Sequence, residues 1–300
     1  MTKINCSIAI FTHRRPYHTK RILKSLDNLF FKKIYVINDG WRNNSEKKLV
    51  LKVRNIIDNK KFTNMRKLFL DQNIGIRNIF KIGLEWVFKH EKKIIILEDD
   101  TLPNNSFFKF CDQLLIKYKN KKKISMVCGT NFKSSLTNKN KNSYFFSKYS
   151  FIWGWATWKD RWALYDNKLK RWNNYKKSKS ITKYFTNNNE IKFWEKNLNY
   201  LSKNQNKGAW DFPLTFTNFY FKKLAIVPKV NLITNIGYDD PSGNNPKKNS
   251  YLKKMSLIFP LMHPSEIKAS SEYDHFCSQK VFSLPSLKNR IINKIIKIFK

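Results

Sequence analysis

Three consecutive carboxylates, Glu98-Asp99-Asp100, are the residues whose types and spacing point most clearly to chemistry. They follow Ile94-Ile95-Ile96-Leu97, an apolar run that predicts a strand buried on both faces. Adjacent carboxylates repel one another and are costly to desolvate, and a cation would relieve both costs. Hard oxygen ligands favour Mg²⁺ or Mn²⁺, which usually hold a substrate phosphate through one or two protein carboxylates. The alternative is a solvated acidic turn ahead of a helix that starts near Pro103.

Two further polar segments follow predicted strands and belong at the same edge of the sheet. Phe11-Thr12-His13-Arg14-Arg15-Pro16 follows the first strand, and Asn38-Asp39-Gly40 follows the second. Ligands of open α/β sheets sit at the carboxyl ends of the strands, so a nucleotide could lie across these segments. In that arrangement Asp39 accepts from a base or ribose, and Arg15 lies near phosphate. For Asn-Asp-Gly a purely local turn is the alternative. The chain has neither Gly-x-Gly-x-x-Gly nor a P-loop pattern, which argues against dinucleotide enzymes and phosphate-loop NTPases.

The apolar periodicity predicts an α/β fold with a mostly parallel, doubly wound central sheet flanked by helices. We expect residues 1–128 to form a nucleotide-binding half, 129–250 an acceptor-binding half and 251–300 a tail. Strands are predicted at 4–11, 34–37, 67–70, 94–97, 124–127 and 225–227, and helices at 16–29, 45–58, 77–88, 107–118, 190–203 and 211–221. Residues 131–143 and 239–250 are polar and predict loops.

The composition indicates an anionic partner and packed aromatic cores. Lys and Arg number 59 against 21 Asp and Glu, a formal net charge of +38, which favours nucleic acid, an anionic membrane face or a phosphorylated substrate. Part of this excess reflects a general bias toward Lys, Asn and Ile. Nine Trp and 15% aromatic residues indicate packed cores and flat binding surfaces. The four cysteines are far apart, which suggests neither a zinc site nor a disulfide framework and fits a reducing, cytoplasmic compartment.

The last fourteen residues, 287–300, predict a basic amphipathic helix. Isoleucines alternate with Lys and Arg at helical spacing, a pattern that can lie in an anionic membrane interface. The alternative is a helix docked on the domain. The N-terminal apolar run is too short for a signal peptide, and no segment approaches the ~20 apolar residues of a membrane span.

Taken together, the motifs resemble those of GT-A-fold glycosyltransferases and are most similar to a bacterial branch close to the N-acetylglucosaminyltransferase I group. The resemblance covers about residues 5–240, and the order and spacing of its motifs are more specific than any one of them. The segments that carry it are Phe11-Thr12-His13-Arg14-Arg15-Pro16, Asn38-Asp39-Gly40, Asn73-Ile74-Gly75, Glu98-Asp99-Asp100, Trp153-Gly154-Trp155-Ala156-Thr157-Trp158, Gly208-Ala209-Trp210-Asp211 and Pro228 to Gly237.

The resemblance implies roles for particular residues. Glu98-Asp99-Asp100 would be a variant of the family's Asp-x-Asp motif that binds Mn²⁺ or Mg²⁺ and the sugar-nucleotide diphosphate, with Asp100 as the direct metal ligand. Asp211 would be the base of an inverting transfer, and the bulk of Trp210 could raise its pKa. The alternative for Asp211 is a helix N-terminal acid. Donor-binding residues would be Thr12, Arg15, Asp39, Asn73, Glu98 and Asp99, and the wall against the sugar or acceptor would comprise Trp153, Gly154, Trp155 and Trp210, unless the aromatic block is simply core.

One departure concerns the segment after Asn235-Ile236-Gly237. Similar chains commonly continue with a His-Thr pair, whereas here Tyr238-Asp239-Asp240 follows, and His263 is too distant to be a confident substitute. Asp239 or Asp240 would then replace the histidine.

The sequence therefore predicts a metal-dependent inverting hexosyl- or N-acetylhexosaminyltransferase. A UDP-sugar is the favoured donor, and a glycan or lipid-linked precursor of a surface polysaccharide is the acceptor. We expect the protein at the inner face of the cytoplasmic membrane, with no specific nucleic-acid partner. The alternatives are a nucleotidyltransferase on a related fold and a basic nucleic-acid-binding protein.

Overall fold

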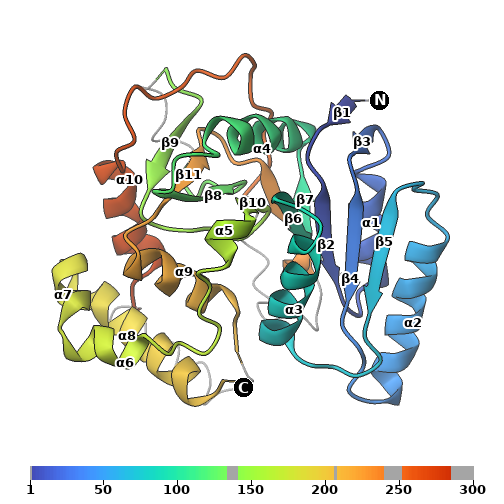
Figure 1. Ribbon diagram of the computed structural model, residues 1–300, viewed down its shortest axis with the longest axis horizontal. Helices are drawn as coiled ribbons and strands as arrows, with labels where there is room; N and C mark the ends of the chain where they lie inside the picture. The colour runs from blue at the N-terminus through green and yellow to red at the C-terminus, as the bar shows by residue number, and fades with distance from the viewer. Residues whose placement is uncertain (1, 134–140, 206–207, 240–251, 285–300) are drawn as a thin grey trace.

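The computed structural model describes residues 2–133, 141–205, 208–239 and 252–284 (Figure 1). Its centre is an eight-stranded mixed sheet in the order β5-β4-β2-β6-β10-β8-β11-β9. Helices cover both faces of this sheet, so the predicted α/β class is confirmed. The strands are β2 (Ile8–Thr12), β4 (Ile34–Asn38), β5 (Met65–Phe69), β6 (Lys93–Glu98), β8 (Ile124–Cys128), β9 (Tyr144–Ser147), β10 (Trp155–Trp158) and β11 (Leu224–Pro228).

Four parallel strands, β5-β4-β2-β6, form the first part of the sheet in the 3-2-1-4 order of doubly wound folds. Strands β2 and β4 are buried along their whole length, as their β-branched runs predict. The crossovers between these strands contain α1 (Pro16–Lys24), α2 (Asn44–Asp58) and α3 (Ile76–Phe88). Because the four strands are parallel, their carboxyl ends meet at one edge, where the predicted motif residues lie.

The aromatic block after residue 150 supplies a strand that the sequence analysis did not predict. Strand β10 runs antiparallel to both of its neighbours, β6 and β8, and sits between them. All four of its residues are buried. A second short sheet pairs β7 (Thr101–Pro103) with β12 (Ile233–Asn235) next to the acidic segment, and a third pairs β1 (Thr2–Ile4) with β3 (Leu29–Phe31).

Two hydrophobic cores lie on opposite faces of the main sheet. One contains apolar side chains of α1, α2 and α4 (Asn105–Lys117). The other contains those of α3, α8 (Asn188–Lys203) and α9 (Asp211–Tyr220). The remaining short helices are α5 (Lys159–Trp162), α6 (Trp172–Lys177), α7 (Ser180–Tyr184), α10 (Ser271–Phe276), the 3₁₀ turn η2 (Gly237–Asp239) and the π-helix η3 (Cys277–Val281).

Most predicted elements are present, with differences at their ends. Helix α1 stops at Lys24 instead of residue 29, because the chain turns at Ser25 and enters β3 at Leu29. The first predicted strand, 4–11, is split into β1 and β2. The predicted helix 287–300 and most of the predicted loops 131–143 and 239–250 lie outside the described residues. Among the residues that are described, no helix is long and apolar enough to cross a membrane.

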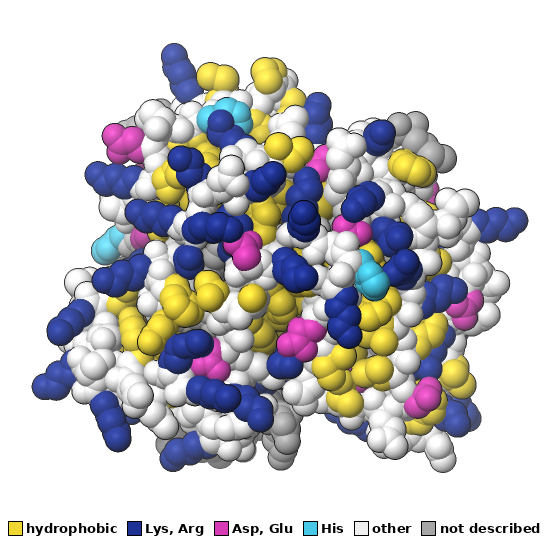
Figure 2. All heavy atoms as spheres, viewed as in Figure 1, with side chains coloured by type: hydrophobic (Ala, Val, Ile, Leu, Met, Phe, Trp, Pro, Cys, Tyr) yellow, Lys and Arg dark blue, Asp and Glu magenta, His cyan; other side chains and the backbone are white. Residues whose placement is uncertain are grey.

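Figure 2 shows how the positive charge is distributed on one face of the molecule. Lys and Arg side chains are spread over the whole of this face and do not gather into one stripe. On this side the positive charge is therefore dispersed over the surface.

Candidate active site

A pocket of about 300 Å³ opens at the carboxyl ends of the parallel strands. Side chains from the ends of β2, β4 and β6 line it, together with the first turn of α3. Six of the residues predicted to bind a donor lie on its wall, although the sequence separates them by up to 87 positions: Thr12, Arg15, Asp39, Asn73, Glu98 and Asp99. The topology of the sheet thus brings the predicted donor residues to a single site.

Arg15 organises the acidic corner of this site. It is the N-cap residue of α1, and its Nη1 lies 2.8 Å from Asp100 Oδ2 and 3.3 Å from Asp99 Oδ1. The backbone N–H of His13 also donates to Asp99, at 3.3 Å. Strand β6 ends at Glu98, where the hydroxyl of Thr101 accepts from the Glu98 N–H. The strand alternation therefore ends before Asp99, and one guanidinium reaches both aspartates.

Two acids of this corner, Asp99 and Glu98, hold their protons more tightly than ordinary carboxyl groups. Burial raises the pKa of Asp99 to about 7, and Asp100 adds to the effect, while Arg15 opposes it. Burial, together with the charges of Asp100, Asp99 and Asp211, raises the pKa of Glu98 well above its usual range. The Glu98 carboxylate has no hydrogen-bond or ion-pair partner among the described residues. The carboxyl groups of this corner thus outnumber the cationic side chain beside them, Arg15.

This donor set fits a hard divalent cation that is shared with a bound diphosphate. Within the described ranges no three His, Cys, Asp or Glu side chains form a ready-made metal cage. Mg²⁺ and Mn²⁺ sites of the shared kind need only one or two carboxylates, with oxygens of substrate and water completing the shell. Asp100, with Asp99 and Glu98 beside it, can supply them, and the raised pKa values show that added positive charge would be stabilised here.

A backbone segment that the sequence analysis did not assign to the site covers Asp100. The N–H of Ile236 donates to the Asp100 carbonyl at 2.7 Å, and Nε2–H of the buried His18 donates to the Ile236 carbonyl at 3.0 Å. A Cβ at Gly237 would lie 2.4 Å from Asp100 Oδ2. A side chain at position 237 would therefore push the Asp100 carboxylate out of its place in the acidic corner. The only sequence signal for this contact was the Asn235-Ile236-Gly237 motif.

Asp211 approaches the same corner from the other half of the chain. It is the first residue of α9, where its own N–H and that of Phe212 stabilise the charged form. Burial outweighs these bonds and raises the Asp211 pKa to about 6. Its charge in turn raises the pKa of Glu98, so the two carboxyl groups interact across the site. A carboxylate with this pKa is ionised near neutral pH and is still a useful proton acceptor.

A stack of aromatic rings holds α9 against the pocket wall. Phe11 and Phe80 line the pocket and stack at 4.0 Å between centroids, and Phe80 stacks on Trp210 at 3.8 Å. Trp210 in turn contacts Trp155 at 5.6 Å. The stack fixes the start of α9, and hence Asp211, relative to the donor pocket.

The prediction of a sugar-binding wall needs correction for three of its four residues. Trp155 and Trp210 are 1% and 2% exposed, so their indoles are core and cannot stack on a ligand in this conformation. Gly154 is buried too; its φ is +61°, and a Cβ there would lie 2.5 Å from Ile233 Cδ1. Trp153 is partly buried and contacts Tyr238, so it alone stays a candidate for that wall.

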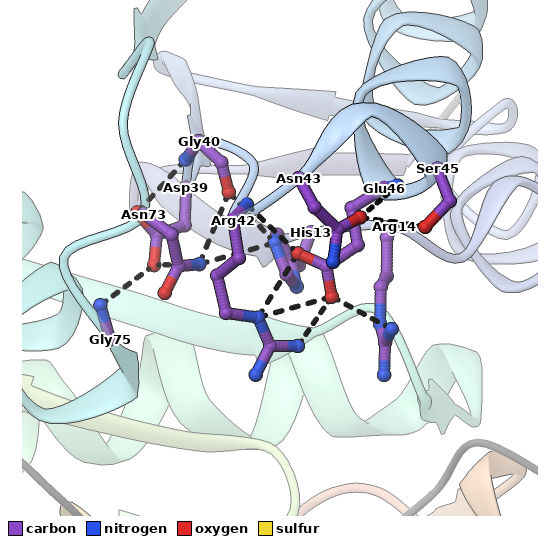
Figure 3. Close-up of polar contacts among 10 residues, drawn as sticks. All are labelled: His13, Arg14, Asp39, Gly40, Arg42, Asn43, Ser45, Glu46, Asn73 and Gly75. Carbon is purple, nitrogen blue, oxygen red and sulfur yellow. Dashed lines mark hydrogen bonds and ion pairs between the residues drawn. The ribbon is translucent and has the colours of Figure 1, made fainter.

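Asp39 occupies the opposite end of the pocket and is saturated by internal hydrogen bonds (Figure 3). Its oxygens accept from the N–H groups of Gly40, Ile74 and Gly75 and from the side-chain amide of Asn73, at 2.9–3.2 Å. A carboxylate offers about four acceptor positions, and all are used. Asp39 therefore positions the Asn73-Ile74-Gly75 turn, and its predicted contact with base or ribose would have to displace one of these bonds.

The sequence analysis missed one cluster beside Asp39. Glu46 is buried in the first turn of α2 and binds both Arg14 and Arg42. The side chain of Asn43 caps the helix by accepting from the Glu46 N–H, and Glu46 accepts from the Arg42 N–H. Asn43 and Glu46 thus occupy the N-cap and N3 positions of a capping box, except that Glu46 accepts from the N–H of Arg42, one residue before the N-cap. The Asn-x-x-Glu spacing is a sequence signal that could have located Glu46.

Comparisons with known proteins give a limited picture. No family model matches the chain, and no curated protein matches it. Among solved structures it is similar to a mannosyltransferase from Pyrobaculum calidifontis in complex with GDP-Man and Mn²⁺ (TM-score 0.35, 11% identity, covering 53% of this chain and 46% of that one). It is also similar to the galactosyltransferase LgtC in complex with donor and acceptor sugar analogues (0.36, 11%, 71% and 70%). A third is glucosyl-3-phosphoglycerate synthase from Mycobacterium tuberculosis in complex with phosphoglyceric acid (0.31, 9%, 52% and 57%).

The chain thus spans 46% and 57% of the first and third of these proteins. Nothing in these comparisons bears on a link to the N-acetylglucosaminyltransferase I group or on a bacterial origin, which stay predictions.

Proposed function

We propose that this protein is a metal-dependent glycosyltransferase that uses a nucleotide-diphosphate sugar. The observation that carries the proposal is the convergence of Glu98, Asp99, Asp100 and Arg15 at strand ends, with Asp211 facing them from α9. The first group suits a diphosphate and its cation. Asp211 suits an acceptor hydroxyl that must lose a proton.

Each residue then has a defined task in an inverting transfer. Asp211 takes the proton of the acceptor hydroxyl as that oxygen attacks the anomeric carbon of the donor. Arg15 donates to the departing diphosphate and stabilises its growing charge. Asp100 would hold the divalent ion, with Asp99 and Glu98 near the donor, and Mn²⁺ or Mg²⁺ when bound would neutralise part of the diphosphate charge. The stacked Phe11, Phe80 and Trp210 maintain the distance between base and donor.

The substrate assignments rest on the sequence alone. We propose a UDP-sugar as donor and a hexosyl or N-acetylhexosaminyl group as the one transferred. The acceptor would be a glycan or lipid-linked precursor of a surface polysaccharide such as lipopolysaccharide or capsule. Residues 287–300 would bring the enzyme to the anionic inner face of the cytoplasmic membrane.

The two other candidate functions lack a specific structural observation in their favour. A nucleotidyltransferase would also use acids at strand ends. That function, however, does not explain why Asp211 faces those acids. A nucleic-acid-binding protein would be expected to concentrate its charge, whereas the face in Figure 2 shows dispersed cations.

The test uses the full chain and a panel of UDP-, GDP-, dTDP- and CMP-sugars with and without Mn²⁺. A ligand that binds only the folded protein raises its melting temperature, and slow hydrolysis of the donor releases nucleotide. We expect one donor to do both only with the metal, and Asp100→Asn to abolish both. Asp58→Asn, at an exposed ion pair on α2, is the matched control. If Asp100→Asn behaves like this control, the metal assignment is wrong.

A further inference from the structure

Two arginines share one buried carboxylate at the rim of the pocket. Glu46 accepts from the Arg42 backbone N–H at 3.0 Å, from its Nε and Nη2, and from Arg14 Nη1 at 2.8 Å. Glu46 is 4% exposed, and these bonds, chiefly those from Arg42, lower its pKa to about 2. The carboxylate therefore stays charged, and it holds both guanidinium groups in fixed positions.

Each guanidinium has N–H groups left over. A guanidinium carries five N–H donors, and Glu46 uses one from Arg14 and two from Arg42. No other described residue accepts from either group. The Arg14 and Arg42 side chains are 29% and 57% exposed, and both line the pocket. Figure 3 shows the two groups on either side of Glu46, extending in the same direction. The remaining N–H groups of Arg14 and Arg42 are therefore hydrogen-bond donors held in fixed positions at the pocket.

Asn73 presents the complementary acceptor. Its Nδ2 donates to Asp39 Oδ2 at 3.0 Å and to the Gly40 carbonyl at 3.1 Å. Both partners are acceptors only, so the amide cannot be flipped, and Oδ1 points away from them. This oxygen has no hydrogen-bond partner among the described residues. Because Asp39 is saturated, Asn73 Oδ1 is an acceptor that the described residues leave free at this end of the pocket.

We propose that Arg42, Arg14 and Asn73 read a nucleobase edge in which a carbonyl adjoins a ring N–H. Uracil, thymine and guanine have this edge, whereas cytosine and adenine present an amino group beside an unprotonated nitrogen. The guanidinium donates to the carbonyl oxygen, and Asn73 Oδ1 accepts the ring N–H. The exposed apolar side chain of Ile76, at the start of α3, lines the same end and supplies a surface for the face of the base.

The spacing of the strands supports this placement, which rests on the proposed function. Asp39 follows β4 and the acids follow β6, two strands away, at a distance of ~10 Å. A nucleoside can span that distance with its diphosphate at Arg15. A second phosphate near Arg42 is the competing ligand. It would lie beside the Asp39 and Glu46 carboxylates and the Asn73 oxygen, all of which repel an anion.

The experiment measures binding of UDP, CDP, GDP and ADP to the full chain by calorimetry in Mn²⁺. UDP and CDP differ only at the base edge. GDP and ADP likewise differ in having a carbonyl beside a ring N–H in one base and an amino group beside an unprotonated nitrogen in the other. Hydrogen bonds to charged groups predict that UDP or GDP binds about 10- to 100-fold tighter than its amino counterpart. Arg42→Ala should lower that ratio, because it removes one donor to the carbonyl and leaves Arg14 and Asn73 in place. Arg21→Ala, a cation on α1 stacked on Tyr17 outside the pocket, should leave it unchanged.

Each other result overturns the inference in a distinguishable way. Equal binding within both pairs refutes base reading but leaves a metal-dependent nucleotide site. An equal loss of UDP and CDP binding in Arg42→Ala means that the arginine senses phosphate. No binding of any of the four nucleotides refutes both this inference and the proposed function. Arg42→Lys keeps the charge but loses the planar donor pair, and it should also lower the ratio. This variant controls for the possibility that Arg42→Ala acts by disturbing the fold.

Discussion

Asp211→Asn should make the protein more stable while making it inactive. The ordinary aspartate pKa of 3.8 and the value of about 6 at this position differ by an amount that corresponds to roughly 3 kcal/mol against the charged form. The side chain is only partly buried, so water screens some of this penalty. We expect the neutral amide to raise the free energy of unfolding by about 1–3 kcal/mol at neutral pH.

The sign of this effect gives it a pH signature. The folded chain binds the proton more tightly than the unfolded chain, so the penalty is absent below the ordinary pKa of 3.8. It grows as the pH rises and is complete above about 6. The stability advantage of Asp211→Asn should therefore be small near pH 4 and largest above pH ~7, where it would raise the melting temperature by roughly 2–6 °C.

The assay is thermal and chemical unfolding of both proteins at acid and neutral pH. Asp58→Asn, at an exposed ion pair, serves as control and should change stability by less than ~0.5 kcal/mol. In transfer assays Asp211→Asn should keep donor binding and lose about 10²–10⁴ in rate. A stability gain that is equal at both pH values would refute the electrostatic argument, and normal turnover would refute the role as base.

Three further predictions concern other parts of the structure. Gly237→Ala should weaken metal-dependent donor binding by at least about tenfold, because its Cβ displaces the Asp100 carboxylate at a cost typical of overpacking; binding like the wild type, measured by calorimetry, would show that the segment is not held there. Phe80→Leu should lower the free energy of unfolding by ~1–3 kcal/mol through loss of two stacking contacts, measured by urea titration; an unchanged midpoint would mean that the stack contributes nothing. Deletion of residues 287–300 should release the protein from anionic vesicles in a sedimentation assay, and unaltered sedimentation would count against the membrane helix.

The parallel half of the fold was predictable because its signals are local. Buried β-branched runs and amphipathic helices alternate there, and each strand ends in a polar segment whose place at the sheet edge follows from the parallel topology. Arg15, Asp39 and Glu98 were placed at this edge for this reason, whereas Asn73 was named only through the family resemblance. Their partners were not predictable, because three of the four bonds that saturate Asp39 depend on how the turn after β5 packs.

The second half could not be predicted to the same degree. A run of aromatic residues from Phe151 to Trp158 is compatible with a wall, a core or a strand, and its periodicity does not separate these. The segment becomes a buried antiparallel strand because it pairs with both β6 and β8, and this pairing depends on the tertiary structure. The same pairing buries Trp155. The contact of Gly237 with Asp100 likewise joins segments more than 130 residues apart and depends on the pairing of β7 with β12.

The position of β10 limits how this protein can be divided. A fragment ending at residue 128 would lack the strand that separates β6 from β8, and the backbone of β6 would become an open, strongly apolar sheet edge. Such edges recruit other chains, so the fragment should aggregate when expressed alone. We therefore expect the segment that carries the donor residues and the segment that carries Asp211 to fold together, and replacing either with that of another protein would require a matching central strand.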